Sequence, residues 1–185
     1  AANTEVADAN LLTIGLADVS AFIGFGGIGV RLTDVDLAIA LWTENVATTP
    51  RSWTTVQASV GSASFEGVDG LTIAATDVGV VVNREHASDH TVVDYKLGTG
   101  EAAGTATELT VTVGPTQTVA FDIDDANGDY LQVTGNAEID IFGFIEVSGS
   151  FGIEKKTNQA LYVSGPAAAN TEVADANLLT IGLAD

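Results

Sequence analysis

Residues 137–154 read AEIDIFGFIEVSGSFGIE, and apolar and polar side chains alternate along this segment. The large apolar residues take odd positions, namely Ile139, Ile141, Ile145, Val147, Phe151 and Ile153. Acidic residues and serines take even positions, and this period of two is typical of a strand with one buried and one solvated face. We therefore predict one long strand here, about 60 Å in length if it is unbroken. Gly143 would permit a bend, and Phe142 and Phe144 interrupt the polar side.

A short motif built around an aspartate recurs three times, as LADV, LTDV and ATDV. Apolar residues alternate before and after each aspartate, but the apolar positions that flank it are three residues apart instead of two. A slip of one residue is what a β-bulge or corner produces, and Asp can bond to the backbone N–H freed there. We predict strand–corner–strand elements bent at Asp18, Asp34 and Asp77. The alternative is that these aspartates line up across stacked strands and share cations.

These patterns predict an all-β fold, either an elongated β-solenoid or a stacked β-sheet repeat unit with long strands, built end to end in an array. Turns are expected at residues 25–29 and at residues 126–129, where Asn-Gly suits a type I′ hairpin turn. Residues 83–104 are polar and rich in Gly and Ala, so we expect a projecting loop. A short helix is expected within residues 1–12.

The first 18 residues, AANTEVADANLLTIGLAD, return without a change at residues 168–185. We interpret the chain as a window on a tandem array, with residues 1–167 forming one full unit and residues 168–185 beginning the next. The junction is expected at residues 166–177 and in the strand that follows. An artificial duplication is the alternative. Identical units that stack end to end build length rather than a new active site, which favours a structural role.

The chain is strongly acidic, with 25 Asp and Glu against 6 Lys and Arg and a formal net charge of −19. This balance argues against nucleic acid and anionic membranes as partners, because both are bound through Lys and Arg. Acidity does not indicate disorder here, because 46% of the residues are hydrophobic. The chain has no cysteine and no apolar run of membrane-spanning length, so we expect neither disulfides nor a transmembrane segment.

The most ligand-like stretch is DIDDANGD at residues 122–129. Ca²⁺ prefers hard oxygen ligands, so this stretch is a candidate calcium site. The candidate ligands are Asp122, Asp124, Asp125, Asn127 and Asp129. The spacing departs from an EF-hand loop, because the sixth position from Asp125 is Tyr130 rather than Gly. An acidic hairpin turn without a bound ion is the alternative.

No catalytic constellation stands out, and we expect no enzyme. The sequence has no nucleophile elbow before a helix, and its carboxylates are too numerous to indicate a glycosidase. His86 and His90 have the spacing of a helical metal site, but their segment lacks helical periodicity, which favours a solvated loop. Trp42 and Trp53 are expected at a core edge or at a seam between units, with stacking on a sugar as the alternative.

Two segments resemble repeats of giant bacterial secreted surface and adhesin-type proteins, which often accompany hemolysin-type calcium-binding repeats. They are GSASFEGVDGLTIAATDVGVVVNR at residues 61–84 and AEIDIFGFIEVSGSFGIEKK at residues 137–156. The calcium-binding nonapeptide GGxGxDxUx does not occur in the chain. The resemblance implies secretion, a location at the bacterial cell surface, a structural role and, by association, Ca²⁺ dependence.

The sequence therefore favours a structural protein of an extracellular fibre, stalk or adhesin shaft, in which acidic β-repeats stack on adjacent copies of themselves. A ligand on a host surface or on a neighbouring cell is a further expected partner. One rival is a lipid-binding or lipid-transfer groove, which predicts a continuous apolar trough across the strands. The other is a carbohydrate-binding β-solenoid, which predicts carboxylates and aromatic side chains on one open face.

Overall fold

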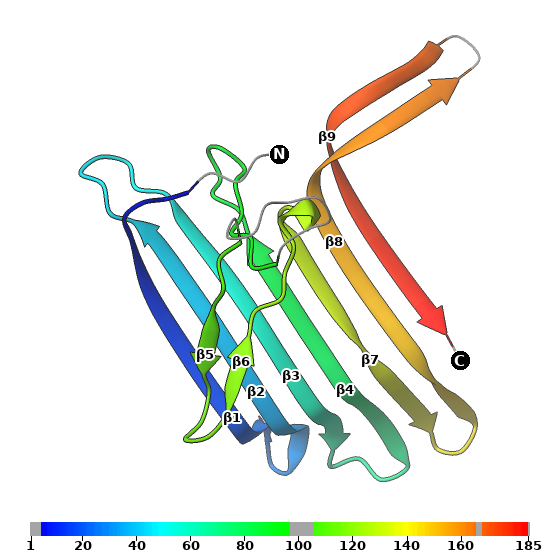
Figure 1. Cartoon of the computed structure of the whole chain (residues 1–185). Helices are drawn as coiled ribbons and strands as arrows, with labels where there is room; N and C mark the ends of the chain where they lie inside the picture. The colour runs from blue at the N-terminus through cyan, green and yellow to red at the C-terminus, as the bar shows by residue number, and fades with distance from the viewer. Residues whose placement is uncertain (1–4, 97–105, 166–167, 185) are drawn as a thin grey trace.

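The structure is a computed structural model of the chain, and it describes residues 5–96, 106–165 and 168–184. Seven long strands form one antiparallel sheet in the order β1-β2-β3-β4-β7-β8-β9 (Figure 1). Their bounds are β1 (Ala9–Phe25), β2 (Ile28–Glu44), β3 (Ser52–Glu66), β4 (Leu71–Arg84), β7 (Tyr130–Ile141), β8 (Ile145–Gly165) and β9 (Ala168–Ala184). The all-β class is confirmed, and the described strands form an open meander that closes into no solenoid.

The predicted single strand over residues 137–154 is wrong, because the chain reverses at its centre. Strands β7 and β8 pair antiparallel with Ile141 opposite Ile145, and Phe142 and Gly143 take φ values of 54° and 69° in the turn. The N–H of Gly143 donates to Asp140 Oδ1 at 2.8 Å, which stabilises the reversal. The alternation runs through this turn because Ile139 lies opposite Val147, so both arms place apolar residues on one face.

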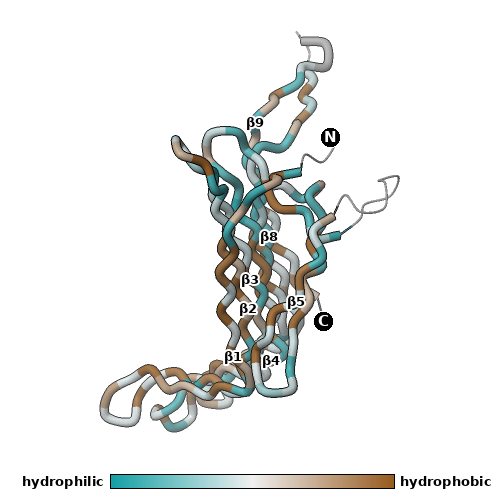
Figure 2. Tube along the Cα trace, turned by 60° about the vertical axis from the view of Figure 1, so that its left-hand side comes forward, coloured by the Kyte–Doolittle hydropathy of each residue, from teal (hydrophilic) through white to brown (hydrophobic). Residues whose placement is uncertain are grey.

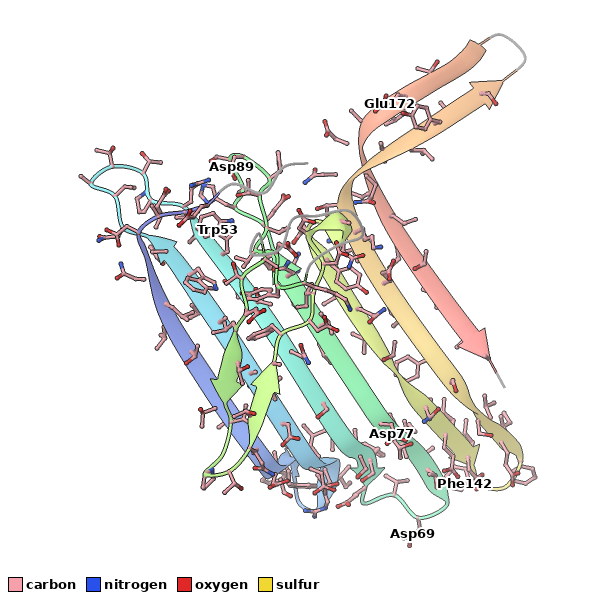
Figure 3. All side chains as sticks on the ribbon, viewed as in Figure 1. Trp53, Asp69, Asp77, Asp89, Phe142 and Glu172 are labelled. Carbon is pink, nitrogen blue, oxygen red and sulfur yellow. The ribbon has the colours of Figure 1, made fainter. Side chains whose placement is uncertain are left out.

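The predicted bends at the motif aspartates are confirmed. Asp18, Asp34 and Asp77 have φ values of 54°, 53° and 52°, in the left-handed region that Asp adopts more readily than most residues. The ladder shifts register beside Asp18 and Asp77, as a bulge requires. Figure 2 shows the strands bending at their lower ends, and Figure 3 places Asp77 there. The N–H of Asp18 donates to Asp36 Oδ1 at 3.0 Å.

The segment between β4 and β7 covers the upper part of one face of the sheet. It contains β5 (Thr110–Thr112), β6 (Thr118–Ala120) and the short 3₁₀ turn η1 (Asp125–Asn127). Its apolar side chains form the hydrophobic core with small residues of β2; the buried members are Ala38, Ala40, Tyr95, Val111, Val113, Phe121 and Ile123. We call the side of the sheet that carries Ala38 and Ala40 the covered face, and the opposite side the open face.

Two features fix the covering segment in place. Gly15 has no side chain where β5 crosses β1, and a Cβ there would lie 2.1 Å from the carbonyl oxygen of Thr112. A buried polar network lies beneath Tyr95, whose hydroxyl contacts Thr55 Oγ1 at 3.0 Å and accepts from Trp42 Nε1 at 3.1 Å. Asn83, fully buried, accepts from Thr55 and donates to the carbonyl oxygen of Val93. Satisfied buried polar groups of this kind hold one specific packing arrangement.

Three smaller sequence predictions are corrected. Residues 126–129 form no hairpin turn; Asp124 caps η1 by accepting from the N–H of Ala126, and Gly128 ends that turn. The expected helix within residues 1–12 is absent from its described part, where β1 already begins at Ala9. The expected projecting loop at residues 83–104 is buried at Asn83, Asp94 and Tyr95, and residues 97–105 lie outside the described residues.

Candidate interaction surfaces

The open face carries an apolar row that crosses all seven strands of the sheet. Side chains alternate between faces along a strand, and directly opposite residues in neighbouring strands share a face. Following the pairing from one strand to the next gives Leu16, Leu37, Ala58, Val80, Val133, Ile153 and Ile181. Nothing in the described part of the chain covers this row, whereas the hairpin β5–β6 lies over the opposite face (Figure 1).

The apolar surface continues below the aspartate bulges into the turns at the lower end. The sheet bends there toward the side away from β5, so the open face lies on the inner side of the bend (Figure 2). Phe25 and Phe144 in these turns are 93% and 90% exposed, and Ile23 is 69% exposed. Contiguous exposed apolar surface on this scale is characteristic of a surface that contacts another molecule.

The two edges of the sheet are made from the same sequence. β1 lies at one edge and pairs with β2, whereas β9, which repeats residues 1–17, lies at the other edge and pairs with β8. The pairing of β9 places Ile181 opposite Ile153 and Val173 opposite Leu161. The upper parts of β8 and β9 extend beyond the rest of the sheet as a two-stranded arm, on which Figure 3 labels Glu172. An unprotected edge strand is a ready template for pairing with a further strand.

A polar cluster lies where the arm leaves the sheet. Asn158, which has a φ of 55° at a register shift in β8, donates to Glu85 Oε2 at 2.7 Å. Glu85 Oε1 lies 2.9 Å from His90 Nδ1, and this hydrogen bond together with the charge of Glu85 raises the pKa of His90. Asp175 in β9 adds a smaller contribution in the same direction. The protonation of His90 is therefore linked to β9.

The predicted calcium ligands do not converge on one point within the described residues. Asp122 pairs with Lys96 at 3.0 Å, and Asp124 caps η1. Asp129, which is 7% exposed, pairs with Arg84 at 3.1 Å and accepts from Thr157. No group of three or more His, Asp or Glu side chains in the described ranges is arranged to hold a metal ion. Calcium binding by Asp122, Asp124, Asp125, Asn127 and Asp129 stays a prediction.

The histidines and tryptophans have protein partners. His86 Nδ1 accepts from the N–H of Ser52 at 3.3 Å, and its main chain bridges to Thr91 in an irregular segment, not a helix. Trp53, 6% exposed, donates to the carbonyl oxygen of Thr91, and Trp42 belongs to the network around Tyr95. Both tryptophans therefore lie at the edge of the core, as the first of the two interpretations expects.

An ion-pair cluster supports the upper end of β2 and β3. Arg51 contacts Glu44 at 2.9 Å and Asp89 at 3.3 Å. The hydrogen bond from Arg51 lowers the pKa of Glu44. For Asp89, burial alone would raise the pKa, but hydrogen bonds from Thr91 and the charge of Arg51 outweigh it, so the pKa is lowered. Figure 3 shows Asp89 and Trp53 at this end of the sheet.

No family model, curated protein or solved structure matches the chain. Among the described residues, no helix has the length and apolar character needed to cross a membrane.

Proposed function

We propose that this chain is the repeat unit of a structural protein, which builds an extracellular fibre, stalk or adhesin shaft at a bacterial cell surface. The observation that carries the proposal is the identity between the two edge strands of the sheet. The same segment forms the first strand and the last strand of the sheet, so a further unit can follow each copy, and the sheet gains length with every unit. The resemblance of residues 61–84 and 137–156 to giant surface-protein repeats agrees with this proposal.

The charge of the unit suits the same role. When Glu172, Asp175 and Asp185 of the second copy are set aside, one unit keeps a net charge of −16. Like charges on neighbouring fibres repel and keep the fibres dispersed, and divalent cations reduce that repulsion. Calcium is thus proposed as a modulator of the fibre.

The test is electron microscopy of native material, together with gels run with and without boiling and with EDTA. Regular fibres with a constant axial repeat support the proposal, and dispersed compact particles contradict it. A very high mass that survives boiling means one covalent array, whereas a band near the mass of a single unit means assembly of separate subunits. Loss of fibre order in EDTA supports the proposed role of calcium, and unchanged fibre order contradicts that role.

One observation favours a second function, a surface that binds acyl chains. The uncovered apolar row and the bend beneath it form the kind of continuous apolar trough that a lipid-binding groove requires. This alternative predicts that purified protein carries lipid. Organic extraction followed by mass spectrometry would find about one or more acyl chains per unit if the trough holds lipid, and none if units cover the trough themselves.

A further inference from the structure

We propose that consecutive units share a strand, so that one antiparallel sheet runs without interruption from each unit into the next. In this arrangement β9 of one unit is β1 of the following unit, with β8 bonded to one of its edges and β2 of the following unit to the other. The partner is a second copy of this unit. The inference rests on the proposed fibre function, since it states how units join.

Strand direction and free edge agree between the two copies. The strands of the meander alternate in direction, so β1 and β9, separated by five strands, run the same way. β1 uses one edge for β2, and no described strand pairs with its other edge, whereas β9 uses for β8 the edge that corresponds to this second edge of β1. Every strand inside a sheet needs a neighbour at each edge to satisfy its N–H and C=O groups. Each copy thus supplies the pairing that the other lacks.

The two copies also present the same face. Ile181 lies opposite Ile153 on the open face, and its counterpart Ile14 lies opposite Ile39, which is also on the open face. If the register with β8 and the register with β2 differed by an odd number of residues, this isoleucine would face opposite sides of the sheet in the two pairings, and one strand could not make both. The apolar row that begins at Leu16 therefore continues into the next unit through the residues equivalent to Ile14 and Ile39.

The covered face leaves room for the next unit. In β1, Gly15 lies beneath the backbone of Thr112 and Val113, where no Cβ fits. Its counterpart in β9 is Gly182, and a Cβ built there meets no atom of the described residues within 4 Å. The position beside Gly182 is thus free for the β5–β6 hairpin of the following unit.

The shared strand sets the dimensions of the assembly. Residues 176–184 of β9 repeat residues 9–17 of β1, so β9 counts as the first strand of the following unit and each unit adds six strands to the sheet. Neighbouring strands lie about 4.8 Å apart, which gives an advance of about 29 Å per unit with the strands running across the long axis. The row that starts at Leu16 ends at Ile181, which is the copy of Ile14. Each unit is therefore displaced along the strand direction by two residues, or about 7 Å, relative to the unit before it.

The first experiment uses the full chain, whose lack of cysteine makes disulfide cross-linking specific. Leu178→Pro with Thr180→Pro releases β9 by removing two N–H donors that point to β8. The N–H of Thr157 donates to Asp129, so odd residues of β8 bond to β7, and its even residues, which lie opposite residues 178 and 180, bond to β9. On this background Ile14→Cys with Ile153→Cys should give a ladder of disulfide-linked oligomers, because β1 of a neighbour takes the vacated edge of β8. Positions directly opposite lie about 4.5–5.5 Å apart, which suits a disulfide.

Two controls fix the register. Leu16→Cys with Ile153→Cys on the released background should not cross-link, because the copy of Leu16 lies opposite Phe151, one row away. Ile153→Cys with Ile181→Cys in the chain without prolines should form an intrachain bond and remain monomeric. A released chain that keeps its circular dichroism spectrum but stays monomeric overturns the proposal, as do equal yields from the two cysteine pairs.

Fibre diffraction of native material needs no variant and is the second measurement. A reflection at about 4.8 Å along the fibre axis, with a layer-line repeat near 29 Å, supports the shared strand. Fibres whose strands run along the axis, or whose repeat differs, overturn the shared strand and leave the fibre function intact. Material that forms no fibres contradicts the proposed function itself, and the cross-linking result then decides the strand pairing separately.

Discussion

Identical sequence adopts two environments at the ends of this chain. Residues 9–17 lie beside β2 beneath the β5–β6 hairpin, whereas residues 176–184 lie beside β8, and a Cβ built at Gly182 meets none of the described residues within 4 Å. The residues just before them differ in conformation: Glu5 to Asp8 form no strand, but Glu172 to Asp175 belong to β9 because β8 is there to pair with them. Pairing partners, not the local sequence, therefore decide where this strand begins.

The largest expected difference between the copies is at their glycine. Gly15→Ala should lower the free energy of unfolding by about 2–3 kcal/mol, because the new methyl group would overlap the backbone of β5. Gly182→Ala is the matched control and should change it by less than about 0.5 kcal/mol. Urea unfolding followed by circular dichroism measures both. Equal effects would show that β5 does not lie against β1.

The apolar row provides a second matched pair. Leu16 is 43% exposed beside Leu37, whereas its counterpart Leu183 is 83% exposed. Leu16→Ala should therefore cost about 1 kcal/mol of stability, and Leu183→Ala distinctly less, because the cost follows the apolar area that is buried. The same urea titration measures this difference. In longer arrays the two costs should become equal if each unit supplies the missing neighbour.

Amide exchange compares the segments that differ in conformation. Amides of residues 171–175 should exchange more slowly than those of residues 5–8, on the order of tenfold, because an arm of two strands protects only modestly. Hydrogen exchange read by NMR resolves the two copies. Similar rates would mean that the arm opens as readily as an unpaired segment.

The smallest expected effect is electrostatic. Asp175→Asn should lower the pKa of His90 slightly, since Asp175 is a minor cause of its raised value, whereas Asp8→Asn should leave it unchanged. Asp8 instead accepts from Asn45 Nδ2 at 2.9 Å. An NMR titration measures the pKa of His90 in both variants, and an equal change in the two would contradict the assigned contacts.

The same pKa sets a pH dependence. The pKa of His90 is higher in the folded chain than in the unfolded chain, mainly because of Glu85. The stabilisation from this pair is therefore fully present below about pH 6.5 and is lost as the pH rises through the folded value. Glu85→Gln should remove most of this dependence.

The sequence predicts the strands and their bends well because both depend on local alternation. The slip at Asp18, Asp34 and Asp77 is visible in the spacing of apolar residues, and the structure places a bulge or bend at each. The reversal at Phe142 and Gly143 leaves no mark on this alternation, because a hairpin between paired apolar positions keeps the period of two undisturbed. A glycine flanked by aromatic residues was the available signal.

The covering segment could not be predicted, because its contacts are distant in the sequence. Tyr95 meets Thr55 and Trp42 across 40 and 53 residues, and no local pattern indicates that a polar stretch returns over the sheet. The reason for a glycine at position 15 becomes clear only when β5 is known to cross β1 at that residue. For the calcium candidates, composition draws attention to residues 122–129, but Lys96 and Arg84 contact Asp122 and Asp129 from elsewhere in the chain.

The six-strand advance has an electrostatic consequence when it is combined with the charge of one unit. A net charge of −16 spread over about 29 Å amounts to roughly one negative charge per 1.8 Å, close to the value for double-stranded DNA. A line of charge this dense gathers a condensed layer of counterions. The assembled protein would then behave as a polyelectrolyte, whose stiffness and solubility follow the valence of the ions around it as much as the contacts between its strands.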